Sequence, residues 1–185
     1  MKPNMIYLDF ETSGLDPSRH AILQAAWIIE RDGEVISERV IDICPESDAD
    51  MCLAALECNN FSLERIKAGK SVGYFLEAFR ADGLQISHPR ICGHNIQFDI
   101  GFLMAAIKKH HDNLTLYFDF KKAVDTVSIA RFLDYQGLIS LPDYKLVTLC
   151  KHFGIQIKAH DALEDIRATR QLFYRLYSLQ TGKNK

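Results

Sequence analysis

The chain contains few cysteines and no paired cysteine motif. Five cysteines occur among 185 residues, and no two of them are separated by only two residues. An odd number without such a spacing argues against a disulfide framework and against a structural zinc site. We therefore predict reduced thiols in a cytoplasmic protein, with Cys92 and Cys150 as small residues of the core.

Long apolar runs and an excess of one charge are also lacking. No apolar run approaches the length of a membrane-spanning helix, and the first residues, Met-Lys-Pro-Asn, contain no apolar stretch of a signal peptide. We expect no association with a membrane. The formal net charge of -2 differs from the strongly basic character of proteins that bind long nucleic acids electrostatically. An enzyme that binds a chain end through metal ions is still compatible with this charge.

The composition is that of one globular domain with a sizeable core. Hydrophobic residues make up 48% of the chain and charged residues 25%. No repeat, low-complexity segment or linker divides the sequence. We predict a single domain over residues 1–180 and a flexible polar tail over residues 181–185.

Three apolar segments with the character of β-strands open the chain, at residues 5–10, 21–30 and 35–43. The dipeptide Asp32-Gly33 lies between the second and the third segment. Asp-Gly between two apolar segments is a strong signal for a β-hairpin. The sequence therefore predicts a three-stranded antiparallel meander.

Helical periodicity dominates the rest of the chain. We predict helices at residues 61–68, 72–81, 96–109, 145–153 and 161–179, a short strand at 90–93, and a strand or turn followed by a helix within 124–133. Strands thus come first, and strands and helices then alternate. This order predicts an α/β fold, in which a mixed sheet adds parallel strands to the meander and carries helices on both faces.

Asp9 and Glu11 form the first of three acidic motifs. They lie two residues apart in a predicted strand, so their carboxylates share one face. They also lie at the C-terminal end of that strand, where open α/β sheets usually bind ligands. Two such close negative charges raise each other's pKa unless a cation joins them. A strand that simply runs into solvent would explain this pair equally well.

Asp99 belongs to the second motif, at the start of the predicted helix 96–109. His94 and Asn95 precede it, and Asn95 is a candidate N-cap. An acid in the first turn interacts favourably with the helix dipole, which would by itself explain Asp99. Buried carboxylates, however, need a partner charge or a metal. If Asp99 converges with the first motif, the three acids would form a site for a divalent cation.

The third motif combines His160 with Asp165. Asp161 and Glu164 have the spacing of a capping box, which makes Asp161 the predicted N-cap of the last helix. His160 would then lie on the approaching loop, and Asp165 in the first turn. On this interpretation an imidazole and a carboxylate meet at one site. A surface histidine and an acid that favours the helix dipole are the alternative.

Taken together and in this order, the motifs resemble the DEDDh branch of the 3′→5′ exonuclease superfamily, which includes proofreading subunits, ribonuclease T and oligoribonuclease. Residues 7–16 look like the first exonuclease motif and residues 93–103 like the second. Residues 160–165 fit the third, H-x-A-x-x-D, and residues 145–155 resemble the helix and turn that lead into it. The similarity covers essentially the whole chain.

The resemblance implies a ribonuclease H-like fold and a metal-dependent mechanism. The residues at its motif positions imply a site of four acids and one base, namely Asp9, Glu11, Asp99, Asp165 and His160. The acids would bind two divalent ions, Mg²⁺ or Mn²⁺, because hard oxygen ligands select such ions. The histidine is the family's general base, since its near-neutral pKa suits taking a proton from water.

The resemblance also implies substrate contacts and partners. By analogy, Leu15 would pack against terminal bases, Thr12 would approach the last nucleotide, and Asn95 would orient the turn before Asp99 or cap its helix. A buried turn residue is the alternative for Leu15. The expected substrate is a 3′ end of single-stranded DNA, from which nucleoside 5′-monophosphates are released.

Three alternatives stay open at this point. The substrate could be RNA or a short oligoribonucleotide, because the sequence does not distinguish recognition of the 2′-hydroxyl. A non-catalytic nucleic-acid-binding module would predict loss of an acid or of the histidine, and all five residues are present. A polymerase or repair complex and a homodimer are both compatible with the resemblance, as is a role in proofreading.

Overall fold

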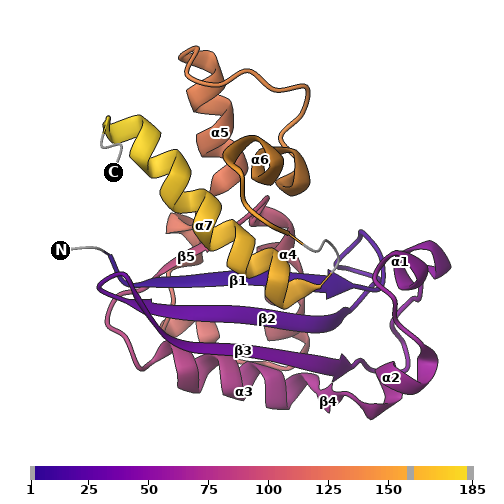
Figure 1. Cartoon of the computed structure of the whole chain (residues 1–185). Coiled ribbons are helices and arrows are strands. Elements are labelled where there is room, and N and C mark those ends of the chain that lie inside the picture. The colour runs from indigo at the N-terminus through magenta and orange to yellow at the C-terminus, as the bar shows by residue number, and fades with distance from the viewer. Residues whose placement is uncertain (1–2, 158–160, 183–185) are drawn as a thin grey trace.

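The computed structural model describes residues 3–157 and 161–182. Its sheet has six strands in the order β4-β3-β2-β1-β5-β6. They comprise β1 (Met5–Thr12), β2 (Ile22–Arg31), β3 (Glu34–Cys44), β4 (Lys70–Ser71), β5 (Arg90–Gly93) and β6 (Val124–Asp125). Strands β1, β2 and β3 form an antiparallel meander, and β5 and β6 extend it in parallel (Figure 1). The predicted mixed sheet is confirmed.

The predicted hairpin between β2 and β3 turns at Asp32 and Gly33. Both residues have positive φ angles, 53° and 91°. Such a pair of left-handed residues matches the right-handed twist of the flanking strands, and Asp-Gly adopts it at low cost. The local sequence therefore accounts for the turn.

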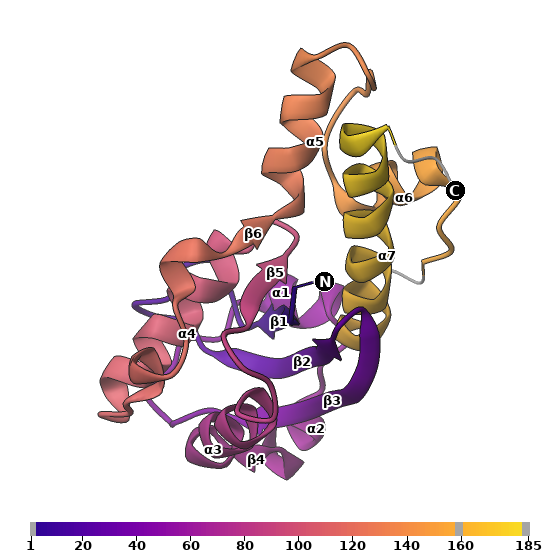
Figure 2. The ribbon, with the colours of Figure 1, turned by 90° about the vertical axis from the view of Figure 1, so that its left-hand side faces the viewer.

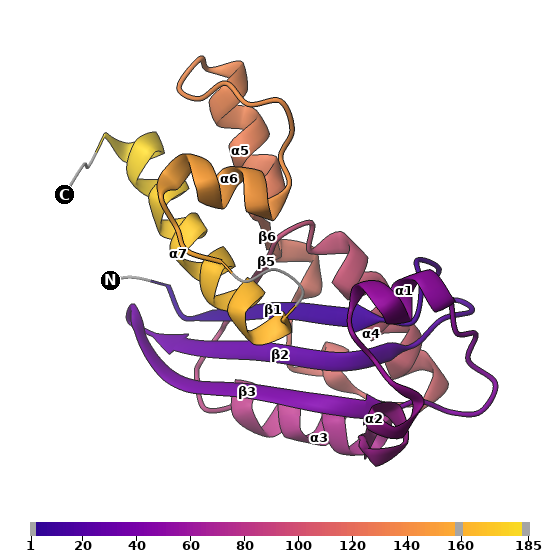
Figure 3. The ribbon, with the colours of Figure 1, turned by 45° about the vertical axis from the view of Figure 1, so that its right-hand side comes forward.

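Seven α-helices surround the sheet within the described residues. They are α1 (Leu53–Cys58), α2 (Leu63–Ala68), α3 (Val72–Gly83), α4 (Gln97–Lys109), α5 (Thr126–Tyr135), α6 (Leu146–Phe153) and α7 (Ala162–Thr181). Short 3₁₀ helices at Leu114–Leu116 and Phe120–Lys122 connect α4 to β6. Helix α3 lies against one face of the sheet and α7 against the other (Figure 3).

The side chains of β1 alternate between the two faces of the sheet and so contribute to both layers. Ile6, Leu8 and Phe10 are buried in a cluster that also contains residues of α3 and α4. Tyr7, on the opposite face, belongs to a cluster with Ile166 of α7. A third buried cluster joins α5, α6 and the C-terminal half of α7, which stand clear of the sheet (Figures 1 and 2). The N-terminal end of α7 lies above the C-terminal end of β1.

Several predicted boundaries need correction. The helix expected from residue 61 begins at Leu63, because the Ser62 side chain accepts a hydrogen bond from the backbone of Arg65 and caps it. Helix α1 and strand β4 were not predicted. Thr181 is the last residue of α7 and not the first of the expected tail, and residues 183–185 lie outside the described residues.

Two further findings concern the thiols and the helices. No disulfide joins the five cysteines, all of which lie within the described residues, and Cys92 and Cys150 are buried. Within the part of the chain that the structure describes, no helix combines the length and the hydrophobicity needed to cross a membrane.

Candidate active site

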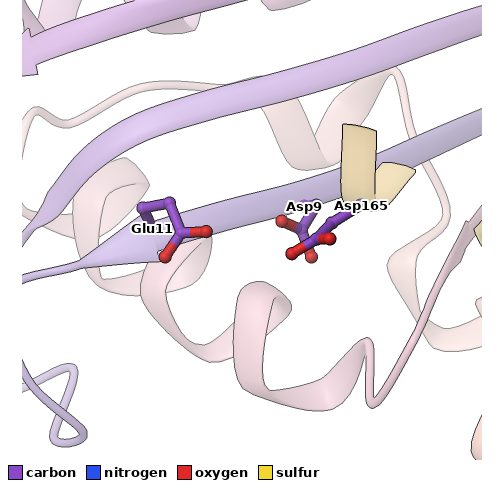
Figure 4. A group of neighbouring side chains, drawn as sticks. All are labelled: Asp9, Glu11 and Asp165. Atoms are coloured by element: carbon purple, nitrogen blue, oxygen red, sulfur yellow. The ribbon is translucent and has the colours of Figure 1, made fainter. Parts of the chain in front are cut away.

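Three carboxylates meet where β1 passes under the first turn of α7. Asp9 and Glu11 come from β1, and Asp165 comes from α7 (Figure 4). One oxygen atom of each lies within 4.8 Å of the others. The two strand residues point to the same face because side chains two apart in a strand do so. Distant parts of the sequence therefore converge on one acidic cluster.

The start of α7 is fixed by the predicted N-cap. The Asp161 carboxylate accepts hydrogen bonds from the backbone N–H groups of Leu163 and Glu164, at 3.1 and 3.3 Å. This confirms Asp161 as the cap, whereas the Glu164 side chain pairs with Arg167 at 2.7 Å and does not complete a capping box. With the helix beginning here, Asp165 falls in its first turn, next to the buried Ile166.

Asp99 is attached to the backbone of the same strand. It is only 3% exposed and lies in the first turn of α4. Its Oδ1 accepts a hydrogen bond of 2.9 Å from the backbone N–H of Phe10, the residue between Asp9 and Glu11. Asp99 is not a member of the group of three close carboxylates. Its contact fixes α4 against β1 directly beside that group.

Asn95 does not cap α4, so this alternative is wrong. The N-cap position belongs to Ile96, and no side chain accepts a hydrogen bond there. Asn95 adopts a left-handed conformation with φ of 58°, and its backbone N–H donates to the Asp125 carboxylate at 2.8 Å. Asn95 thus forms the turn before α4. His160, the predicted base, lies outside the described residues.

The other two predicted substrate-binding residues lie at the C-terminal end of β1. Thr12 is buried, and its hydroxyl donates to the carbonyl of Gly14 at 2.8 Å. The Asn59 side-chain amide donates to the carbonyl of Thr12 at 3.3 Å. Leu15 is 83% exposed, which rules out the alternative of a buried turn residue. Its apolar side chain projects from the loop that leaves the site.

Gly14 and His20 give this loop its shape. A Cβ atom at Gly14 would lie 2.1 Å from the His20 ring. The ring can pack against residue 14 only because glycine has no side chain. Asp16 accepts hydrogen bonds from the backbone and hydroxyl of Ser18, which is the predicted turn chemistry. The close packing leaves Leu15 at the tip.

The carboxylates strongly disfavour negative charge on one another. Burial, followed by repulsion from Asp99, Glu11 and Asp165, holds the pKa of Asp9 well above its ordinary range. Burial and then repulsion from Asp165 and Asp161 raise the pKa of Glu11 to about 7. A divalent cation would compensate this repulsion, and a cluster of carboxylate oxygens is the ligand set that hard cations prefer. The residues therefore fit such an ion.

Arg65 is a neighbour of the site that we did not predict. Its guanidinium forms a two-pronged pair with Asp42 at 2.8 Å and lies 3.9 Å from the centre of the Phe61 ring. Its positive charge opposes the burial and the repulsion that raise the pKa of Glu11. No local sequence pattern marks Arg65 as a neighbour of the site. It is brought there by Asp42, which lies on β3 and reaches the region of Glu11 because both residues pair with Gln24 on β2.

The sheet order and the carboxylate cluster together define a ribonuclease H-like nuclease fold. The Exonuclease family model, RNase T, matches residues 6–173. The chain therefore belongs to this exonuclease family, within the DEDDh superfamily of 3′→5′ exonucleases, as the motifs predict. Members of the family use divalent metal ions.

Curated relatives are much longer than this chain. It is 27% identical over 176 residues to the "DNA polymerase III PolC-type" of Thermotoga petrophila, a match that covers 94% of this chain and 12% of the relative. The protein of the same name from Halalkalibacterium halodurans is 28% identical over 182 residues, covering 97% and 12%. The chain thus spans about an eighth of the curated relatives that it matches.

Solved structures of Exonuclease I from E. coli share the fold. The complex with a dT13 oligonucleotide has a TM-score of 0.82 at 20% identity, covering 98% of this chain and 42% of that chain. A zinc-bound form of its complex with single-stranded DNA has a TM-score of 0.84 at 19% identity, covering 98% and 42%. The predicted α/β class is confirmed by these similarities.

Proposed function

We propose that the protein is a metal-dependent 3′→5′ exonuclease that releases nucleoside 5′-monophosphates from the ends of single-stranded DNA. The observation that carries this proposal is the meeting of Asp9, Glu11 and Asp165, with one oxygen of each inside 4.8 Å. Carboxylates this close are costly unless a cation joins them. Family membership supplies the type of reaction.

Asp9, Glu11 and Asp165 would hold two divalent ions, Mg²⁺ or Mn²⁺. When bound, such ions lower the pKa of the attacking water and stabilise charge on the leaving oxygen. Asp99 keeps α4 attached to β1 through the Phe10 N–H and contributes directly or through water. His160 is the proposed general base, which takes the proton from water.

The substrate would be bound around the loop that follows β1. Leu15 offers an exposed apolar side chain for the terminal bases. Thr12 ends β1 where the turn after that strand begins, and Asn95 forms the turn before α4. We propose that both turns approach the terminal nucleotide. The Exonuclease I structures with DNA oligonucleotides support a single-stranded DNA substrate.

Two further assignments accompany this proposal. A polymerase or repair complex is a candidate partner, because the curated relatives are polymerases of PolC type. We also propose a cytoplasmic location, which cysteines without disulfides support. RNA ends are the alternative substrate, and a homodimer stays a prediction.

Replacement of Asp9 tests the proposal. Asp9→Ala should lower metal-dependent hydrolysis by about a thousandfold or more, because it removes a carboxylate shared by the cluster. Asp119→Asn, at an exposed acid that pairs with Lys122, is the matched control and should behave like the parent. Circular dichroism shows whether each variant is folded. Hydrolysis by Asp9→Ala at the parent rate would refute the site.

The position of the label distinguishes the reaction and its substrate. With a 3′-labelled oligonucleotide, the label should leave at once as a mononucleotide, while a 5′ label should give a ladder of products. Internal fragments without a ladder would indicate an endonuclease. Matched DNA and RNA oligonucleotides should be compared in the same assay, and faster degradation of RNA would favour the alternative substrate.

A further inference from the structure

A second concave site lies away from the carboxylates. It is a cavity of about 690 Å³ on the α3 and α4 side of the sheet. Its walls come from the C-terminal half of α4, the loop between β1 and β2, and the segment that follows β3. Its volume falls within the range of sites for small organic ligands. None of the roles proposed above uses it.

The floor of this cavity is apolar. Phe102, Ala105 and Ala106 contribute one side of α4, and Ile22 and Val72 complete the floor. Phe102 itself is 2% exposed, so the floor is part of the packed core and does not depend on a flexible side chain. The accessible part of the floor is formed by the half-buried Ala105 and Ala106, whose apolar surface can accept the face of a nucleobase.

Ion pairs link the two walls of the cavity. The Lys109 ammonium binds Asp48 at 2.6 Å and approaches Glu46 at 3.7 Å. The His110 ring pairs with Glu46 at 2.5 Å. Both acids that line the cavity are therefore paired with side chains of α4.

The remaining charged side chains on the rim are positive. Lys108 forms no ion pair within the described residues and is exposed. Arg19 pairs with Asp50 but keeps a side chain that is 67% exposed. The imidazoles of His20 and His111 also line the cavity and can donate hydrogen bonds to phosphate oxygens. An apolar floor with a cationic rim suits a ligand that combines planar bases with phosphates.

One helix connects the cavity to the carboxylate site. Asp99 lies in the first turn of α4 and Lys108 near its end, which corresponds to about 14 Å along the helix. The loop that carries Leu15 packs on α4 between them, since a Cβ atom at Gly101 would meet Pro17 at 3.7 Å. Stacked nucleotides are about 3.4 Å apart along a strand, so about four of them span this distance.

We infer that this cavity binds the substrate strand upstream of its 3′ end, with a base on the floor at Ala105 and Ala106 and a phosphate at Lys108. The inference rests on the proposed nuclease function and extends it. A strand that leaves the carboxylates passes Leu15, crosses the loop and reaches the cavity about four nucleotides away. Substrates shorter than this would not reach it.

Two variants test the cavity, one by charge and one by shape. Lys108→Ala removes the cation without touching the core, and Ala105→Phe fills the floor. Lys121→Ala is the matched control, because Lys121 is also an exposed lysine and does not line the cavity. Circular dichroism and the melting temperature show whether Ala105→Phe is folded; Lys108→Ala keeps the test valid if it is not.

Hydrolysis and binding are measured separately, with a twelve-nucleotide DNA and a dinucleotide. Both cavity variants should raise KM for the long substrate about threefold to tenfold, and leave the dinucleotide unchanged. Anisotropy of a fluorescent twelve-nucleotide DNA, with Ca²⁺ in place of the catalytic ion, should show the same loss of affinity. For Lys108→Ala, the salt dependence of binding should also fall by about 0.7 in log–log slope.

Three results would overturn the inference. Effects of both variants no larger than that of Lys121→Ala would show that the long strand does not use the cavity. Equal effects on the dinucleotide would place the change at the carboxylate site. A change of sedimentation mass in Ala105→Phe would identify the cavity as a contact between copies of the chain. If the parent hydrolyses neither substrate, the proposed function fails, while the anisotropy still reports on the cavity.

Discussion

Replacing Glu11 by glutamine should stabilise the metal-free protein at alkaline pH. Burial, with repulsion from Asp165 and Asp161, raises the pKa of Glu11 from 4.5 to about 7. The folded state therefore binds this proton more tightly than the unfolded state, and stability is lost as the pH rises from about 4.5 to 7. The difference of about 2.5 pKa units corresponds to about 3 kcal/mol above this window.

Glu11→Gln removes the charge and keeps the shape. At about pH 8 with a chelator, we expect a free energy of unfolding up to about 3 kcal/mol higher than that of the parent. For a chain of this length each kcal/mol raises the melting temperature by about 2 to 4 °C. At about pH 4 Glu11 is protonated in both states, and the two proteins should melt together.

Calorimetric melting at both pH values, with and without Mn²⁺, is the assay. Glu77→Gln, at an exposed glutamate on α3, is the control and should shift little at either pH. Mn²⁺ should raise the melting temperature of the parent more than that of Glu11→Gln, since the variant has lost a ligand. A variant less stable than the parent at about pH 8 without metal would refute the electrostatic reasoning.

Three other substitutions test the surroundings of the site, with stability measured by urea unfolding. Asp99→Ala should be less stable than Asp99→Asn by about 1 to 3 kcal/mol, because only the amide can still accept the Phe10 N–H; equal stabilities would contradict this contact. Gly14→Ala should cost about 1 to 3 kcal/mol through its clash with the His20 ring, and His20→Ala should remove most of that cost in the double variant. Leu15→Ala should change stability by less than about 0.5 kcal/mol while raising KM for DNA, and an unchanged KM would exclude it from substrate binding.

Local chemistry predicted several elements of the fold, some of them next to the site. The Asp32-Gly33 turn, strand β5 and the cap at Asp161 each depend on residues that are close in sequence. Helix α1 was missed because it has only six residues and its N-cap, Cys52, makes no side-chain hydrogen bond. Such a short helix is held by packing, here of the buried Leu56, and not by its own sequence signals.

Local sequence patterns could not predict the contacts that assemble the site. Asn95 looked like a cap, but its left-handed backbone donates to Asp125, which is 30 residues away. The hydrogen bond between Asp99 and Phe10 joins residues 89 apart. Arg65 reaches the region of Glu11 through a pairing that depends on the register of three strands. The motifs pointed to three acids that the fold does bring together, whereas the contacts that support them follow from the sheet.

Anomalous diffraction from crystals grown with Mn²⁺ tests the central claim most directly, namely that separated acids form one cation site. We predict manganese peaks at about 2.0 to 2.3 Å from carboxylate oxygens of Asp9, Glu11 and Asp165, and their loss in Asp9→Asn. Peaks elsewhere on the protein, or none at these oxygens at saturating Mn²⁺, would contradict the account.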